Sequence, residues 1–180
     1  MNLPIPQGIK VPSLSRKDIQ EITRRVRASI DWDKPWFPVV QFLEFGLPKL
    51  FPGFLYEVLP RSCMGENHGA TFPEKNLIQI REDVYEGADS GNGRDRLTVC
   101  HEIGHFFLHR DLPAWTKRIS RNNAHKTFED SEWQADCFAG ELLMPYELKE
   151  KNPSVSELQA LCGVSQAAAR FHRNTWGSKK

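Results

Sequence analysis

The chain has 180 residues and a formal net charge of +1, with 39% hydrophobic and 26% charged residues. This is the composition of an ordinary globular protein, and the near-zero charge excludes a strong overall field toward nucleic acid or membrane. No apolar run is long enough to span a membrane, and the first residues lack a signal-peptide pattern. The four cysteines form no C-x-x-C pair. We therefore expect reduced thiols and a soluble cytoplasmic protein.

The first third of the chain predicts helices. Ser15 begins a capping pattern, and apolar residues at helical spacing follow it, which predicts an amphipathic helix over residues 16–30. Residues 39–50 predict a second helix with an interruption near Gly46. This part of the sequence therefore indicates helical packing and no chemistry of its own.

Three short segments rich in β-branched and aromatic residues come next. Residues 54–59 and 76–81 predict strands, and a shorter strand is expected over 69–72. Short strands in series favour hairpin-like connections, so the sequence predicts a small antiparallel three-stranded sheet over 54–81. The last strand is a candidate edge for an extended peptide, or else an ordinary sheet strand. The polar stretch 86–94 predicts a loop.

Two histidines four residues apart, His101 and His105, lie in a helix predicted over residues 97–110. In a helix this spacing places both imidazoles on one face, where they can bind one metal ion. Glu102 follows the first histidine and lies within reach of a water molecule on that ion. The pattern is typical of zinc hydrolases.

A catalytic zinc site needs a third protein ligand. On a straight helix His109 lies about 12 Å along the axis from His101, too far to share one ion, so we expect it to contact a ligand instead. Glu132 is the better candidate, in a second helix predicted over residues 128–144. Asp136, one turn further on, can accept the free N–H of a zinc-bound histidine.

Metal-assisted hydrolysis is the chemistry that this arrangement predicts. Zinc lowers the pKa of a bound water toward about 7, and Glu102 is placed to take the proton as that water attacks. A second donor to the developing oxyanion would help. Four side chains are candidates for that donor: Tyr85, His125, Tyr146 and His172.

Two runs resemble the ImmA/IrrE-type metallopeptidase family: HEIGHFFLH from His101, preceded by GRDRLT, and EWQADCFAGELLMP from Glu132. The resemblance spans about residues 76–145. It implies a gluzincin-like fold, one zinc ion held by His101, His105 and Glu132, and Glu102 as the catalytic base. It also implies a typical substrate, a DNA-binding repressor or related regulator, often encoded nearby in a phage, mobile element or toxin–antitoxin module.

The C-terminal segment predicts a pair of short helices. Ser154 begins a capping box, and Gly163 separates the first helix from the second, as in a helix-turn-helix module. Packing on the rest of the protein is the favoured interpretation, and direct contact with DNA is the alternative.

The sequence as a whole predicts an α+β protein with a mainly helical zincin-like domain and a short C-terminal helix-turn-helix-like pair. The expected parts are residues 1–150 for the domain, with helices in 15–50, the sheet in 54–81 and zinc-binding helices in 97–110 and 128–144, and residues 151–180 for the appendage. The expected function is a zinc endopeptidase of narrow specificity acting on a repressor or antitoxin-type regulator. The alternative is a non-proteolytic binding or regulatory module with the same fold.

Overall fold

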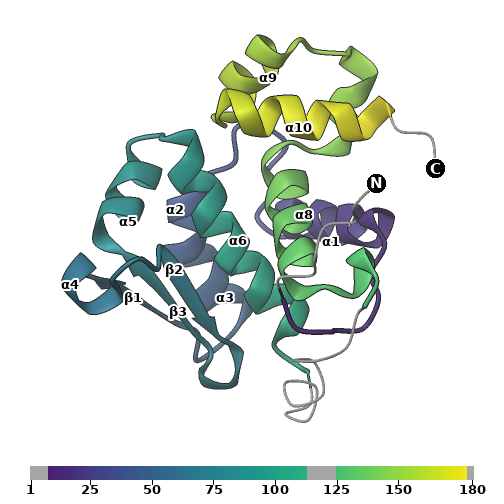
Figure 1. Cartoon of the computed structure of the whole chain (residues 1–180). Helices are drawn as coiled ribbons and strands as arrows, with labels where there is room; N and C mark the ends of the chain where they lie inside the picture. The colour runs from purple at the N-terminus through teal and green to yellow at the C-terminus, as the bar shows by residue number, and fades with distance from the viewer. Residues whose placement is uncertain (1–7, 113–124, 178–180) are drawn as a thin grey trace.

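The computed structural model describes residues 8–112 and 125–177 (Figure 1). Helices dominate these residues, and one small three-stranded sheet lies at the side of the molecule, which confirms the predicted mainly helical α+β class (Figure 1). None of the described helices is both long and apolar enough to cross a membrane. All four cysteines lie in the described part and form no disulfide, as expected.

The N-terminal region folds into helices as predicted, but the second helix is not interrupted. Ser15 caps the first helix through the expected capping box with Asp18. The second helix passes through a π-helical turn, where a Cβ at Gly46 would lie 2.3 Å from the Phe42 ring. Gly46 therefore makes room for a buried aromatic ring and does not break the helix. The elements are α1 (Arg16–Ala28), α2 (Val39–Gln41), the π-helical turn Phe42–Gly46 and α3 (Leu47–Leu50).

The sheet is mixed, so the expectation of a wholly antiparallel sheet is wrong for one pair. The strand order is β1-β3-β2, with β1 (Leu55–Leu59) parallel to β3 (Leu77–Arg81) and β2 (Gly69–Phe72) antiparallel to β3. The link from β1 to β2 runs through the short helix α4 (Arg61–Met64) instead of a hairpin, which carries β2 to the far side of β3. The edge proposed for residues 77–81 is therefore occupied on both sides, and β1 and β2 are the outer strands.

The loop predicted over residues 86–94 is largely helical. Helix α5 (Glu82–Asp89) starts directly after β3 and buries Val84 and Ala88, which are one helical turn apart. The Gly- and Asp-rich composition of this stretch masked that short apolar spacing. Helix α6 (Gly93–His109) then begins after the Asn92 cap, four residues earlier than predicted.

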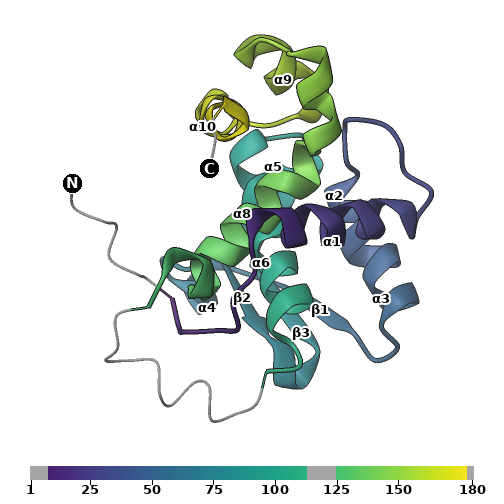
Figure 2. The same ribbon diagram turned by 90° about the vertical axis from the view of Figure 1, so that its right-hand side faces the viewer.

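Helices α6 and α8 (Ser131–Leu143) pack side by side and form the centre of the molecule (Figures 1 and 2). Ile103 and Phe106 of α6 and Phe138 of α8 are fully buried in the shared core. A Cβ at Gly104 would lie only 3.1 Å from the carbonyl oxygen of Ala135. Glycine at this position therefore permits the close backbone approach that the two helices make.

The C-terminal helices α9 (Val155–Cys162) and α10 (Gln166–Gly177) pack on the same core, as the favoured interpretation expected. Leu158 of α9 is fully buried. The Arg96 guanidinium on α6 donates to the carbonyl oxygen of Gly163 at 2.9 Å and so ties the turn between α9 and α10 to the centre of the molecule. The remaining short elements are 3-10 turns: Pro73–Lys75, Thr127–Glu129 and Tyr146–Lys151.

Docking of α10 makes stability dependent on pH through His172. This side chain is 2% exposed, and its Nε2 donates to the carbonyl oxygen of Met144 at 2.9 Å. Burial and the nearby charge of Arg16 lower the pKa of His172 to about 4. Because an unfolded histidine has a pKa of about 6.5, the unfolded chain takes up a proton that the folded protein excludes, and stability falls as pH decreases from about 6.5 to 4.

We predict that His172→Gln gives a shallower pH dependence of the free energy of unfolding than the parent between pH 7 and pH 5. The difference should approach about 1.4 kcal/mol per pH unit below pH 6. Urea denaturation at stepped pH values measures it. Parallel profiles for the two proteins would show that His172 is not buried in its neutral form.

Candidate metal centre

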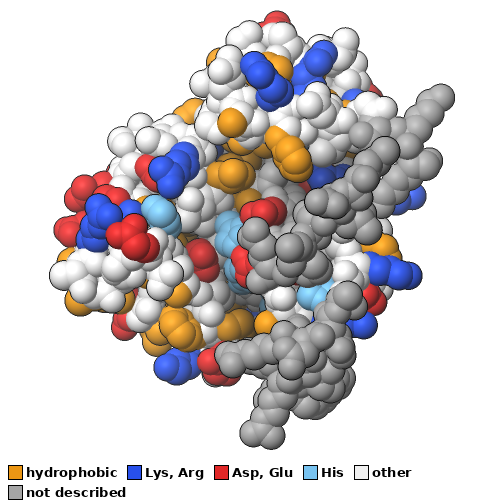
Figure 3. All heavy atoms as spheres, viewed as in Figure 1, with side chains coloured by type: hydrophobic (Ala, Val, Ile, Leu, Met, Phe, Trp, Pro, Cys, Tyr) orange, Lys and Arg blue, Asp and Glu red, His pale blue; other side chains and the backbone are white. Residues whose placement is uncertain are grey.

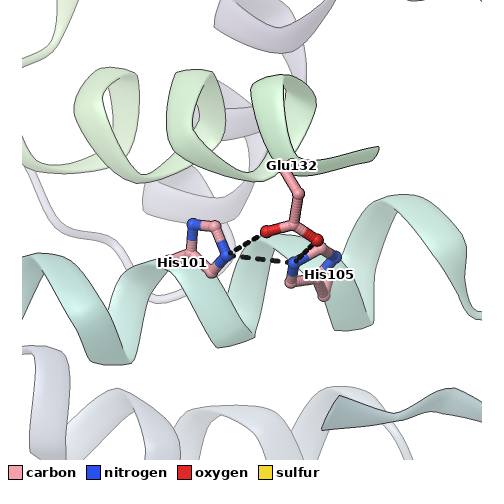
Figure 4. Close-up of side chains that lie close together, drawn as sticks. All are labelled: His101, His105 and Glu132. Atoms are coloured by element: carbon pink, nitrogen blue, oxygen red, sulfur yellow. Dashed lines mark hydrogen bonds and ion pairs between the residues drawn. The ribbon is translucent and has the colours of Figure 1, made fainter. Parts of the chain in front are cut away.

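Three side chains from two helices meet in the groove between α6 and α8 (Figure 4). His101 and His105 come from α6, and Glu132 comes from the first turn of α8. The two imidazole Nε2 atoms are 3.0 Å apart, and the Glu132 oxygens lie 3.2 Å from His101 Nε2 and 3.3 Å from His105 Nε2. The structure thus brings together the three residues that were expected to bind a metal.

The spacing of these atoms fits a single zinc ion. A tetrahedral zinc about 2.0–2.1 Å from each ligand holds its ligand atoms about 3.3 Å apart. The two histidine nitrogens are 3.0 Å apart, and they lie 3.2 and 3.3 Å from different oxygens of the Glu132 carboxylate, which is close to that value. Two imidazoles and one carboxylate also form a donor set found in catalytic zinc sites, with one position left for water.

The carboxylates around His101 create a negative field that favours a positive charge at the cluster of His101, His105 and Glu132. The neighbouring imidazoles of His101 and His105 hold the pKa of the Glu132 carboxyl well below its ordinary value, so it is ionised. Burial disfavours the charged form of His101, but three carboxylates outweigh burial and raise its pKa to about 10: those of Asp136, Glu132 and Glu102. A field of this sign is the one that a cation site requires.

Asp136 orients His101. Its Oδ1 lies 2.8 Å from His101 Nδ1, one helical turn beyond Glu132 on the same face of α8. The carboxylate accepts the Nδ1–H, so the Nε2 of His101 faces Glu132. This is the position that the sequence predicted for Asp136.

A longer chain of hydrogen bonds sets the tautomer of His105. Gln134 Nε2 donates to the carbonyl oxygens of Pro12 and Phe128, each at 2.8 Å, which turns its Oε1 toward His109 Nε2 at 3.1 Å. Because Oε1 only accepts, neutral His109 carries its proton on Nε2, and its bare Nδ1 accepts from His105 Nδ1–H at 3.1 Å. Neutral His105 therefore presents an unprotonated Nε2 to the cluster.

Burial keeps His109 neutral. The side chain is 8% exposed, and burial together with the nearby His105 lowers the pKa of His109 to about 4. His109 contacts the candidate ligand His105 and does not join the cluster of His101, His105 and Glu132. The distance between His109 and His101 along the helix predicted this.

Glu102 is held by the sheet, through two residues that sequence reasoning missed. Thr71 Oγ1 lies 2.7 Å from Glu102 Oε2 and donates to it. A Cβ at Gly69 would lie 2.6 Å from Glu102 Cγ and 2.9 Å from Oε1, so only glycine leaves room for this side chain beside β2. Glycine inside a predicted strand is a known sign of close approach and was the available signal.

The two tyrosines considered as oxyanion donors are engaged elsewhere. The Tyr85 hydroxyl donates to Glu44, and this hydrogen bond, burial and the charge of Glu44 raise the pKa of Tyr85. Tyr146 is exposed, and its hydroxyl accepts from Lys149 Nζ at 3.1 Å. Within the described residues neither tyrosine hydrogen-bonds to the three clustered side chains.

The two candidate histidines also have other partners. His125 Nε2 lies 2.8 Å from Oδ2 of Asp130, the residue that caps α8. His172 donates to the backbone of Met144 beneath α10. These contacts stabilise the two ends of α8.

A small mixed sheet beside two helices that present two histidines and a glutamate is an arrangement of the metallopeptidase type, with a candidate metal site. Residues 61–172 match the family Peptidase_M78, the IrrE N-terminal-like domain, and the chain belongs to this family. A comparison with curated proteins gives no match. Among solved structures, a Mycobacterium tuberculosis transcriptional regulator shares the fold, with a TM-score of 0.56 and 13% sequence identity. The alignment covers 87% of this chain and 55% of the regulator, so the chain spans about half of that protein's length.

The hydrogen-bond chain through His109 predicts the zinc affinity of a matched pair of variants. His109→Asn keeps an acceptor for His105 Nδ1–H, whereas His109→Leu removes it, and both lose the contact with Gln134. We expect His109→Leu to bind zinc about 10- to 100-fold more weakly than the parent and His109→Asn to lose much less. Competition with a chelator measures the affinities, and far-UV circular dichroism checks folding. Equal losses in the two variants would contradict a role in setting the tautomer.

Proposed function

We propose that this protein is a zinc-dependent endopeptidase of narrow specificity. The observation that carries the proposal is the arrangement of three donors spaced for one ion with Glu102 next to them on α6. A zinc ion held by His101, His105 and Glu132 would supply Lewis acidity for activating water and polarising a carbonyl. Membership of the Peptidase_M78 family supports the same chemistry.

In this proposal Glu102 is the general base. It is 8% exposed, and Thr71 anchors its Oε2, while Gly69 leaves space beside Oε1. In the proposed reaction Glu102 accepts a proton from the attacking water and returns it to the amine nitrogen as the C–N bond breaks. The atoms of water then end in the two products, and the carboxylate is regenerated.

The position of β2 supports an extended polypeptide as the substrate. Among the described strands β2 pairs only with β3, and it lies alongside α6 (Figure 1). An extended chain can add to such an outer strand by backbone hydrogen bonds, which require no particular sequence. We propose a DNA-binding regulator encoded nearby as the physiological substrate, on the family resemblance of the two motifs.

A regulator that binds its partner without cutting it is the second candidate function. The likeness of fold to a transcriptional regulator favours it. In this alternative the clustered side chains hold the partner or stabilise the fold, and Glu102 has no catalytic role. Loss of Glu102 distinguishes the two functions.

We predict that Glu102→Gln retains zinc and loses hydrolysis by about 10²-fold or more, because the ligands remain while the base is removed. The experiment co-expresses each variant with the regulator encoded by the neighbouring gene and identifies fragments by mass spectrometry. Glu86→Gln, an exposed change of the same type on α5, is the matched control and should cut like the parent.

Cleavage by Glu102→Gln at the parental rate would contradict the mechanism. If the parent binds the regulator and leaves it intact, the non-proteolytic function is correct.

A further inference from the structure

An apolar cavity lies directly beside the metal centre and is not used by the proposed reaction. Its volume is about 380 Å³, and it opens between α8, the start of α6 and the C-terminal helix α10. Most of its lining is apolar, including Leu97, Trp133, Gly140, Met144, Ala168 and Phe171. Figure 3 shows hydrophobic side chains gathered above the histidines in the hollow of this face, on the side of α9 and α10.

The cavity adjoins the candidate metal centre at Asp136. This residue lines the cavity and also lies 2.8 Å from His101 Nδ1. Leu97, on the opposite wall, is one helical turn before His101, about 6 Å along α6. An extended chain advances about 3.3 Å per residue. A peptide bond at the cluster therefore brings a side chain within two residues of that bond to the mouth of the cavity.

The arginine that lines the cavity is already paired. Arg16 forms a 2.8 Å ion pair with Glu141, and His172 donates to a backbone carbonyl. Asp136 contacts His101 through Oδ1, and its side chain is 72% exposed. An acidic side chain entering the cavity would therefore lose solvent without gaining a free cation among the described lining residues, whereas an apolar one would gain contacts with the aliphatic and aromatic walls.

The C-terminal helix α10 completes the cavity. Small side chains at Ala167 and Ala168 leave the space open, and Phe171 stands at the rim with 70% of its surface exposed. An exposed aromatic side chain on this edge is available to contact an occupant.

We propose that this cavity is a specificity pocket for a large apolar side chain of the substrate, and the proposal rests on the proposed endopeptidase function. The side chain is of the size of leucine, methionine or phenylalanine and lies within two residues of the scissile bond. The C-terminal appendage is then part of substrate recognition. The substrates of this protein carry a large apolar residue at that position.

Binding of two peptide hydroxamates to the zinc-loaded full chain tests the proposal without turnover. One hydroxamate carries leucine at both of the two positions next to the zinc-binding group, and the other carries glycine at both. Isothermal titration calorimetry should show about 10- to 100-fold tighter binding of the leucine compound, the effect of burying one aliphatic side chain.

Ala168→Trp should fill the cavity and abolish this preference, and Phe171→Ala at the exposed rim should reduce it with less risk to folding. Ala160→Trp is the matched control, because Ala160 lies on the exposed face of α9 away from the cavity lining, and it should keep the full preference.

Equal binding of the two hydroxamates to the parent would overturn the pocket and leave the zinc site intact. An unchanged preference in both Ala168→Trp and Phe171→Ala would also overturn it. If neither hydroxamate binds the zinc-loaded chain, the proposed function fails and the pocket falls with it.

Discussion

The close approach of α6 and α8 is the constraint on which the site depends. A glutamate side chain reaches two histidines on another helix only when the two backbones lie nearly in contact. Gly104 permits this, since a Cβ there would lie 3.1 Å from Ala135 O and 3.2 Å from Ala135 Cα. Any larger residue would push the helices apart, and the separations of about 3 Å among the ligand atoms would open. The same contact between the helices buries Ile103 and Phe138, so the packing of the core also determines the spacing of the candidate ligand atoms.

The N-terminal segment before α1 holds the start of α8 in place. The backbone N–H of Val11 donates to Glu129 O at 2.8 Å, and Ser131 N–H donates to Ile9 O at 3.1 Å. Gln134, which is fully buried, completes the connection by donating to Pro12 O. A buried amide is costly unless it is satisfied, and here its three hydrogen bonds connect this segment to His109 and the metal centre. The position of a chain segment far from the zinc motif in sequence therefore contributes to the orientation of His105.

The sequence predicted the parts of the site that lie on regular helices. Helical spacing is enough to place His101 and His105 on one face and to put Asp136 one turn after Glu132. It also showed that His109 is too far along the axis to share the ion. The contacts of Glu102 with Thr71 and Gly69 were not predictable in this way, because they join helix α6 to strand β2, a separate element of the chain whose position helical spacing does not determine.

The errors in the fold have similar physical causes. The parallel pairing of β1 with β3 follows from the path of the chain through α4, and residue patterns within each strand carry no information about that path. Helix α5 has only one turn of apolar spacing in a polar segment, and its stability comes from packing on the sheet and on α6. The cavity beside Asp136 depends on where α10 docks, which no local pattern specifies.

X-ray absorption spectroscopy of the zinc-loaded protein tests whether His101, His105 and Glu132 bind the ion. We expect one zinc per chain with two imidazole nitrogens and oxygen donors at about 2.0–2.2 Å, and loss of the bound zinc in Glu132→Ala. A third imidazole, a sulfur ligand, or full zinc occupancy in Glu132→Ala would contradict the assignment of the site.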